Sequence, residues 1–277
     1  MNRYGKLLNW EIVRFSKFYG ALLVITLLSQ FFGIWLEANS YMNRAEEMMN
    51  RNSISAVQFA AQFGKTSITN GYNSIWIEGP ISLCAVSLLL YIFLIWYKEW
   101  FGKSTFAYRL LMLPTSRMNV YLAKLSAIVL FVLGLVAFQL MLVPIQISVF
   151  DALIPGEFRQ DVPIPELIHR HPLLQTLIPS YFIEFVLYYG AGVMGVVVLF
   201  TAILLERSFR YKGIAAGILY IVTGLLLIIL PVFIAEVMVR YYLYPSEVRL
   251  LQVFIGICIT GLSLWFSSYL LRKKVTI

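Results

Sequence analysis

Six long apolar stretches divide the chain of 277 residues, at roughly 18–37, 79–97, 121–147, 182–205, 214–235 and 251–271. A helix needs about 20 mainly apolar residues to cross about 30 Å of hydrocarbon, and each stretch is about that long. Lipid offers the backbone no hydrogen-bond partners, so each stretch is predicted to be helical. The fold class is therefore all-α, a polytopic membrane protein with six transmembrane helices and a single transmembrane domain over residues 1–277.

The composition excludes an ordinary water-soluble domain. Hydrophobic residues make up 60% of the chain and charged residues 13%. Soluble domains are about 45–50% apolar and about 25% charged. A water-exposed surface cannot cover this excess of apolar side chains, which indicates that lipid surrounds most of the chain.

The connecting segments alternate in charge, and this pattern predicts the orientation. With the amino terminus inside, the inner segments hold 15 of the 22 Lys and Arg but three of the 14 acids, while the outer segments are acidic on balance. Lys and Arg near helix ends resist translocation, so both termini are predicted to be cytoplasmic, in the cell (plasma) membrane. The net charge of +8 therefore indicates contact with anionic membrane lipids rather than with nucleic acid.

The segment before the first stretch, residues 3–19, is amphipathic. At 100° per residue, one face is apolar and the opposite face is basic. The apolar face holds Tyr4, Leu8, Ile12, Phe15 and Tyr19, and the basic face holds Arg3, Lys6, Arg14 and Lys17. This pattern predicts an N-terminal helix lying in the membrane interface, and the alternative is an undocked basic tail. The apolar run that follows is long enough to remain as a span, so a cleaved signal peptide is not expected.

Two outer segments, residues 38–78 and 148–181, are long and mixed in character. The second holds five prolines and is predicted to form an ordered but irregular cap. Pro144 is predicted to kink the outer end of the third span. Two small-xxx-small pairs, Gly213 with Gly217 and Ala191 with Gly195, favour close helix packing, either within one subunit or between subunits.

The sequence gives little support for catalysis, nucleotide binding or metal binding. Gly64-Lys65-Thr66 and Gly102-Lys103-Ser104 resemble the end of a phosphate-binding loop, but the required earlier glycine is replaced by Phe59 and by Tyr97. His169 and His171 lie two residues apart before a proline, and zinc needs three or four convergent ligands. Cys84 and Cys258 lie inside spans and are expected to be buried thiols. We expect no cofactor, no metal and no catalysis by this chain.

The segment Lys98–Lys124, predicted to be cytoplasmic, is unusually apolar for a basic loop. Aromatic and leucine side chains dominate it, including Phe106, Leu110 and Leu113. The residue before Pro114 disfavours the α region, and a hydroxyl residue after the proline can cap a new helix. The pattern predicts a short amphipathic helix, a break and a long helix that enters the membrane. This short helix either lies against lipid or docks a cytoplasmic partner.

The stretch GKSTFAYRLLMLPTSRMNVYLAKL, residues 102–125, resembles the inner loop of ABC-2 type transporter permeases. Leu113, Pro114, Ser116, Arg117 and Lys124 match the pattern of an LP-(S/T)-R turn followed by a lysine. The six spans, the amphipathic start and the inner termini are also typical of this family. The resemblance implies two permease subunits, a homo- or heterodimer, and separate cytoplasmic ATP-binding subunits.

The resemblance implies that the segment Lys98–Lys124 couples the chain to the ATPase. Charged residues are expected to orient the docked surface, and apolar residues around Pro114 to anchor it. These coupling residues are Glu99, Lys103, Phe106, Arg109, Leu110, Leu113, Pro114 and Arg117.

Polar residues near membrane depth mark a weaker substrate pathway, namely Gln139, Gln146 and Glu184. Glu184 is either a cavity-facing acid or a wet interfacial one. The resulting hypothesis is an ABC exporter subunit that carries an amphipathic peptide, lipid or drug. The alternatives are a self-contained secondary transporter or channel, a membrane enzyme, and a resistance protein that acts by binding.

Overall fold

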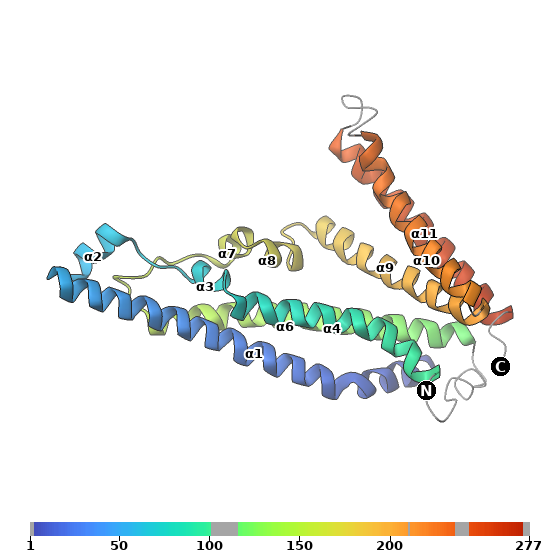
Figure 1. Ribbon diagram of the computed structural model, residues 1–277, viewed down its shortest axis with the longest axis horizontal. Helices are drawn as coiled ribbons and strands as arrows, with labels where there is room; N and C mark the ends of the chain where they lie inside the picture. The colour runs from blue at the N-terminus through green and yellow to red at the C-terminus, as the bar shows by residue number, and fades with distance from the viewer. Residues whose placement is uncertain (1–2, 101–115, 210, 236–243, 274–277) are drawn as a thin grey trace. The chain divides into compact units, whose positions relative to one another are not determined.

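A computed structural model describes residues 3–100, 116–209, 211–235 and 244–273 of the chain (Figure 1). Within these ranges every regular element is a helix. The helices are α1 (Arg3–Asn52), α2 (Ala56–Phe63), α3 (Ile68–Tyr72), α4 (Ile75–Trp100), α6 (Arg117–Leu153), α7 (Ile164–Arg170), α8 (Pro172–Leu177), α9 (Phe182–Phe209), α10 (Tyr211–Phe233) and α11 (Pro245–Lys273). The predicted all-α class is therefore confirmed.

Six helices in the described part of the chain are long and apolar enough to cross a membrane. They are α1, α4, α6, α9, α10 and α11, and they contain the six predicted stretches apart from the last two residues of 214–235. The predicted interfacial segment 3–19 is helical but continues into α1 without a break. The predicted coupling helix falls in residues 101–115, outside the described residues.

The chain divides into two compact units, each of which has its own packing. The first contains Met1–Val13, Leu89–Val129 and Phe182–Ile277, and the second contains Arg14–Leu88 and Leu130–Tyr181. Helices α9, α10 and α11 belong wholly to the first unit, where they pack on one another. The predicted outer segments belong to the second unit.

Glycines set the close approach of α10 to α9 in the first unit. A Cβ on Gly213 would lie 2.3 Å from the Leu205 carbonyl oxygen, and one on Gly217 would lie 2.9 Å from that of Ala202. This small-xxx-small pair therefore packs within one subunit, because only a missing side chain lets the backbones approach so closely. A Cβ on Gly195 would meet nothing within 4 Å, so the Ala191 and Gly195 pair does not pack in this way.

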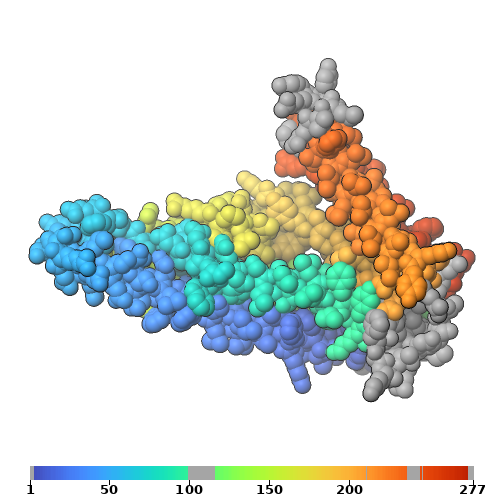
Figure 2. Space-filling view, in the orientation of Figure 1, coloured from blue at the N-terminus to red at the C-terminus, as the bar shows by residue number. Residues whose placement is uncertain are grey.

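The outward face of α10 is almost entirely apolar. Ile218, Leu219 and Leu226 are each more than half exposed, and the helix lies open in the space-filling view (Figure 2, orange). Apolar side chains on the outside of a helix are expected where lipid is the solvent. The exposure of α10 therefore fits its assignment as a span.

The core of the second unit combines side chains of both predicted outer segments with those of the adjoining helices. Buried side chains from α1, α2, α3, α4, α6, α7 and α8 form one cluster there. Its members are Ile34, Ala38, Ala45, Phe59, Ile68, Tyr72, Ile77, Val143, Phe150, Ile154, Phe158, Val162, Leu167 and Leu174. The two outer segments thus fold against each other and against the ends of three long helices.

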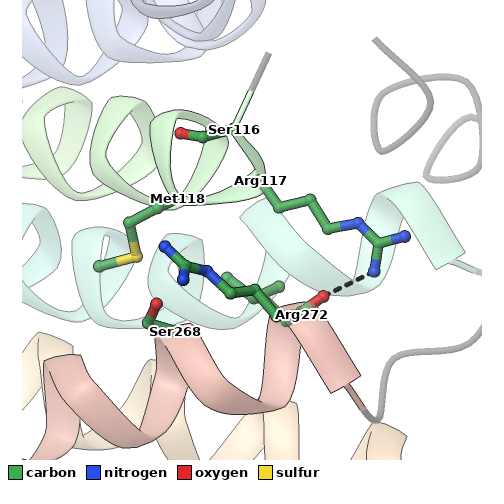
Figure 3. Close-up of a pocket in the computed structure, with 6 residues that line it drawn as sticks. Ser116, Arg117, Met118, Ser268 and Arg272 are labelled. Atoms are coloured by element: carbon green, nitrogen blue, oxygen red, sulfur yellow. Dashed lines mark hydrogen bonds between the residues drawn. The ribbon is translucent and has the colours of Figure 1, made fainter. Parts of the chain in front are cut away.

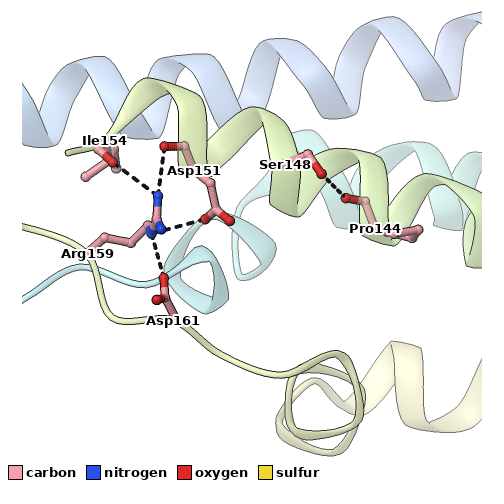
Figure 4. A network of polar contacts seen from close by, with 6 residues as sticks. All are labelled: Pro144, Ser148, Asp151, Ile154, Arg159 and Asp161. Atoms are coloured by element: carbon pink, nitrogen blue, oxygen red, sulfur yellow. Dashed lines mark hydrogen bonds and ion pairs between the residues drawn. The ribbon is translucent and has the colours of Figure 1, made fainter. Parts of the chain in front are cut away.

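A short backbone bridge and one arginine join the outer segments. The Thr66 amide donates to the Phe158 carbonyl at 2.9 Å, and the Gln160 amide donates to the Thr66 carbonyl at 2.8 Å. Arg159 Nε lies 2.6 Å from Asp161 Oδ1 and 3.2 Å from Asp151 Oδ1 (Figure 4). Its Nη1 also donates to the Asp151 carbonyl at 2.8 Å. A cation here satisfies a carbonyl that the end of α6 leaves without an intrahelical donor.

Figure 4 also shows a proline inside α6. Helix α6 continues through Pro144 to Leu153, and the Ser148 hydroxyl donates to the Pro144 carbonyl at 3.0 Å. A serine hydroxyl that bonds the carbonyl four residues earlier is common where a helix departs from ideal geometry. The proline therefore lies within the helix rather than ending it.

Candidate functional site

The predicted coupling residues lie mostly outside the described residues. Lys103, Phe106, Arg109, Leu110, Leu113 and Pro114 all fall in residues 101–115. Glu99 belongs to the last turn of α4, and Arg117 is the first residue of α6. The last turns of α4 and the first turns of α6, which flank this segment, belong to the first unit.

A buried ion pair joins the start of α6 to the start of α1. Lys124 Nζ lies 2.6 Å from Glu11 Oε1, and the two side chains are 0% and 3% exposed. The same ammonium donates to the Ile95 carbonyl of α4 at 3.0 Å and lies 5.3 Å from the centre of the Trp96 ring. Lys124 thus ties three helices together, and a charge at this depth requires such partners.

Aromatic rings lie on one side of this ion pair. Trp96 lies edge-on to Phe200 of α9, with ring centres 5.4 Å apart, and Phe200 lies edge-on to Tyr121 at 5.3 Å. Aromatic pairs in this geometry contribute about 0.5–1.5 kcal/mol beyond their burial. The cluster extends the connection from α4 and α6 to α9.

A second polar contact anchors the end of α4. The Tyr97 hydroxyl donates to the Glu206 carboxylate of α9. The neighbouring Arg207 guanidinium lies 5.3 Å from the centre of the Tyr97 ring, which adds a cation–π contact. The helix before residues 101–115 is therefore fixed to α9 by its last turns.

Arg117 connects α6 to the last helix. Its Nη1 donates to the Leu271 carbonyl at 2.6 Å (Figure 3), in the last turn of α11. A cation is favourable there because the carbonyls of a helix end carry partial negative charge. Of the predicted coupling residues, Arg117 is the one whose side-chain contact is described.

A further set of polar contacts, made by hydroxyl groups, lies where α9, α10 and α11 meet. Thr201 Oγ1 and Ser267 Oγ lie 2.9 Å apart, and both side chains are fully buried. The Tyr220 hydroxyl lies 2.6 Å from Ser263 Oγ. Helix–helix hydrogen bonds of this kind contribute about 0.6 kcal/mol each in membrane proteins. They support the packing of the bundle and do not define a reactive site.

Two of the three predicted pathway residues meet through a third glutamine. Gln30 of α1 donates from Nε2 to Gln139 Oε1 at 3.0 Å and accepts from Gln146 Nε2 at 2.7 Å. The Tyr72 hydroxyl donates to Gln146 Oε1, and burial raises the pKa of Tyr72 above its usual value. The chain of amides ends at Gln139 Nε2, which has no acceptor among the described residues.

Glu184 is the third predicted pathway residue. It is half-buried in the first turn of α9 and belongs to the first unit, whereas the three glutamines belong to the second. No hydrogen bond joins its side chain to another residue in the described ranges. The structure therefore groups Gln139 with Gln146 within the second unit.

The two histidines lie in the predicted outer segment 148–181. His171 is fully buried, caps α8 through Nδ1 and lies 3.3 Å from Glu78 Oε1. His169 Nε2 lies 3.3 Å from Ser180 Oγ. In the described ranges no three His, Cys, Asp or Glu side chains converge as metal ligands. Cys84 is buried, but Cys258 is exposed on the outside of α11, contrary to the expectation that both are buried.

Glu11 and Gln30 are the site residues that the sequence reading missed. Glu11 lies on the same face of α1 as Tyr4, Leu8 and Phe15, all of which are partly or wholly buried. An acid within an apolar stripe at helical spacing is the signal that was available. Gln30 could have been found as the one amide in the first predicted stretch.

These contacts describe a polytopic helical membrane protein whose polar groups tie the spans to one another. No protein-family model, no curated protein and no solved structure matches the chain.

Proposed function

We propose that the chain is the membrane-spanning permease subunit of an ATP-binding cassette transporter of the ABC-2 type. A separate cytoplasmic ATPase subunit would drive it, and a second permease subunit would complete the pathway. The charge of the connecting segments supports a place in the cell membrane with both termini in the cytoplasm.

The contacts of Lys124 carry this proposal. Residues 101–115 connect α4 to α6, and Lys124 holds the start of α6 to Glu11 of α1 and to the Ile95 carbonyl of α4. Such contacts let a push on the connecting segment move three helices together instead of bending one. Packed elements with buried contacts move as rigid bodies, which is how a motor domain can act on a membrane bundle.

The coupling segment supplies the docking surface in this mechanism. Phe106, Leu110 and Leu113 would anchor in the ATPase, and Arg109 and Arg117 would orient it. Apolar and aromatic anchors contribute most of the binding energy at such interfaces, and charges chiefly set orientation. ATP-driven closure of the partner would then displace the segment and the helices attached to it.

Co-purification with an ATPase tests the proposal. The double substitution Phe106→Asp and Leu110→Asp places two charges on the docking surface and should abolish capture of the ATPase by the tagged permease. The matched control is Val57→Asp with Phe63→Asp, which changes two exposed apolar residues of α2 in the outer cap. The control variant should still capture the ATPase. Equal capture by both variants and the wild type would contradict the docking assignment.

A self-contained secondary transporter is the second candidate. The amide chain of Gln30, Gln139 and Gln146 favours it, because polar residues inside spans often mark a substrate or ion pathway. Vesicles that contain this chain alone distinguish the two. Substrate accumulation driven by an ion gradient without ATP would support the secondary transporter, and uptake that requires the ATPase and ATP would support the permease.

The substrate class follows from the largely apolar spans and the folded outer cap. We propose an amphipathic peptide, lipid or drug, because small ions need charged or polar groups along the pathway. Coupled movement of a small ion alone in the same vesicle assay would contradict this choice.

A further inference from the structure

A basic pocket lies between the start of α6 and the end of α11, within the first unit. Its volume is about 450 Å³, and it is lined by Ser116, Arg117, Met118, Ser268, Leu271 and Arg272 (Figure 3). Pockets that bind small ligands usually have volumes of about 300–1,000 Å³. The described residues of the lining include two arginines and no acid, so together they carry a positive charge.

The two arginines of the pocket differ in their bonding. Arg117 donates to the Leu271 carbonyl at 2.6 Å and so is held in place. Arg272 makes no hydrogen bond or ion pair within the described ranges, and Figure 3 shows its guanidinium group between Met118 and Ser268. A guanidinium group presents several donors in a fixed plane that matches the oxygens of a phosphate. Arg272 is therefore available to an anion that enters the pocket.

Two hydroxyl groups and a helix start also line the pocket. Ser116 precedes the first turn of α6, where backbone amides have no intrahelical acceptor. Ser268 makes no hydrogen bond within the described ranges, whereas Thr260 on the same helix donates to the carbonyl four residues earlier at 2.8 Å. The pocket thus combines a free cation, two hydroxyl groups and a helix start, which together suit one phosphate group.

The position of the pocket favours a phosphate that is carried by lipid. Arg117 and Arg272 stand near the predicted cytoplasmic ends of α6 and α11, where lipid headgroups are expected. Met118 and Leu271 add apolar surface beside the polar donors. Basic pockets between spans on the cytoplasmic side are suited to anionic headgroups.

We propose that this pocket binds the phosphate group of an anionic phospholipid from the inner leaflet. The phosphate contacts Arg272 and the hydroxyl groups of Ser116 and Ser268, and the glycerol and acyl chains extend along Met118. Bound lipid then bridges the first turn of α6 and the last turn of α11. The inference goes beyond the proposed function and does not require an ATPase partner.

Native mass spectrometry of the full chain tests the pocket. Protein released from nanodiscs that contain equal amounts of phosphatidylglycerol and phosphatidylcholine should retain phosphatidylglycerol preferentially. Arg272→Gln should weaken this retention about tenfold, the loss expected for one charge-assisted contact. The control is Arg249→Gln, which removes an exposed arginine near the other end of α11 and should change retention less than twofold.

Further arms of the experiment decide the remaining points. Arg272→Lys keeps the charge and loses the planar donors, so it should give an intermediate loss even where the glutamine variant folds poorly. Inorganic phosphate added to phosphatidylcholine nanodiscs tests for a soluble source, and its tight retention would keep the phosphate site while replacing lipid as its ligand. Equal retention of the two lipids, or an equal loss in the Arg249 control, would overturn the proposal.

Discussion

The buried pair of Lys124 and Glu11 gives the sharpest test of how the helices are held. Changing either residue to methionine leaves the other charge buried, since the two side chains are 0% and 3% exposed. Removal of one partner of such a pair costs about 3–5 kcal/mol, because the remaining charge loses its counter-charge in a low-dielectric interior. We expect each single variant to lose about that much stability.

The double variant, Lys124→Met with Glu11→Met, should recover most of this loss. It leaves no buried charge, and apolar residues of similar size often replace a buried ion pair at little net cost. The Ile95 carbonyl loses one donor in this variant but remains within α4. The free energy of unfolding of the double variant should therefore fall much less than the sum of the two single losses.

Unfolding of the purified protein in mixed micelles, followed by tryptophan fluorescence, measures these differences. The control cycle uses Glu166 and Arg170 of α7, whose side chains are 44% and 50% exposed and 2.5 Å apart at their nearest polar atoms. An exposed pair of this kind is worth about 0.3–0.5 kcal/mol, so all three of its variants should stay close to the wild type. The reasoning would be refuted if the double variant, Lys124→Met with Glu11→Met, were no more stable than the less stable of the two single variants.

Three further predictions concern packing and hydrogen bonding, and thermal or denaturant unfolding measures each of them. Gly213→Ala should destabilise the protein by about 1–3 kcal/mol, since its methyl group would overlap the backbone of α9; Gly224→Ala, whose Cβ would lie 3.9 Å from its nearest neighbour, should be tolerated. Gln30→Leu should cost about 1–3 kcal/mol because Gln139 Oε1 loses its donor and Gln146 Nε2 loses its acceptor. Gln139→Leu removes the end of the amide chain and should cost less. Folding raises the pKa of Tyr72 above its ordinary value of 10.0. The neutral phenol therefore stabilises the fold below pH 10, and this contribution is lost as the pH rises further. Tyr72→Phe should lose less stability at alkaline pH than the wild type does.

Local patterns in the sequence were sufficient to predict the spans. The composition of each apolar stretch by itself predicts a helix in contact with lipid. In its described part, the structure contains six helices at those positions. Residues 148–181, predicted to form an ordered but irregular cap, contain the short helices α7 and α8 and contribute buried side chains to the core of the second unit. Within the first predicted outer segment, α1 runs to Asn52 and α2 begins at Ala56 after the Ser55 cap.

Pairing between distant residues needed the tertiary structure. Lys124 and Glu11 lie 113 residues apart, and Gln30 lies 109 residues from Gln139. Hydrophobicity and helical period describe each residue's own segment, whereas a buried charge or amide is stable only beside a particular partner. The sequence by itself therefore determined which segments cross the membrane and on which face each side chain lies. The tertiary structure decided which polar groups meet inside, because that depends on how separate helices turn and pack against one another.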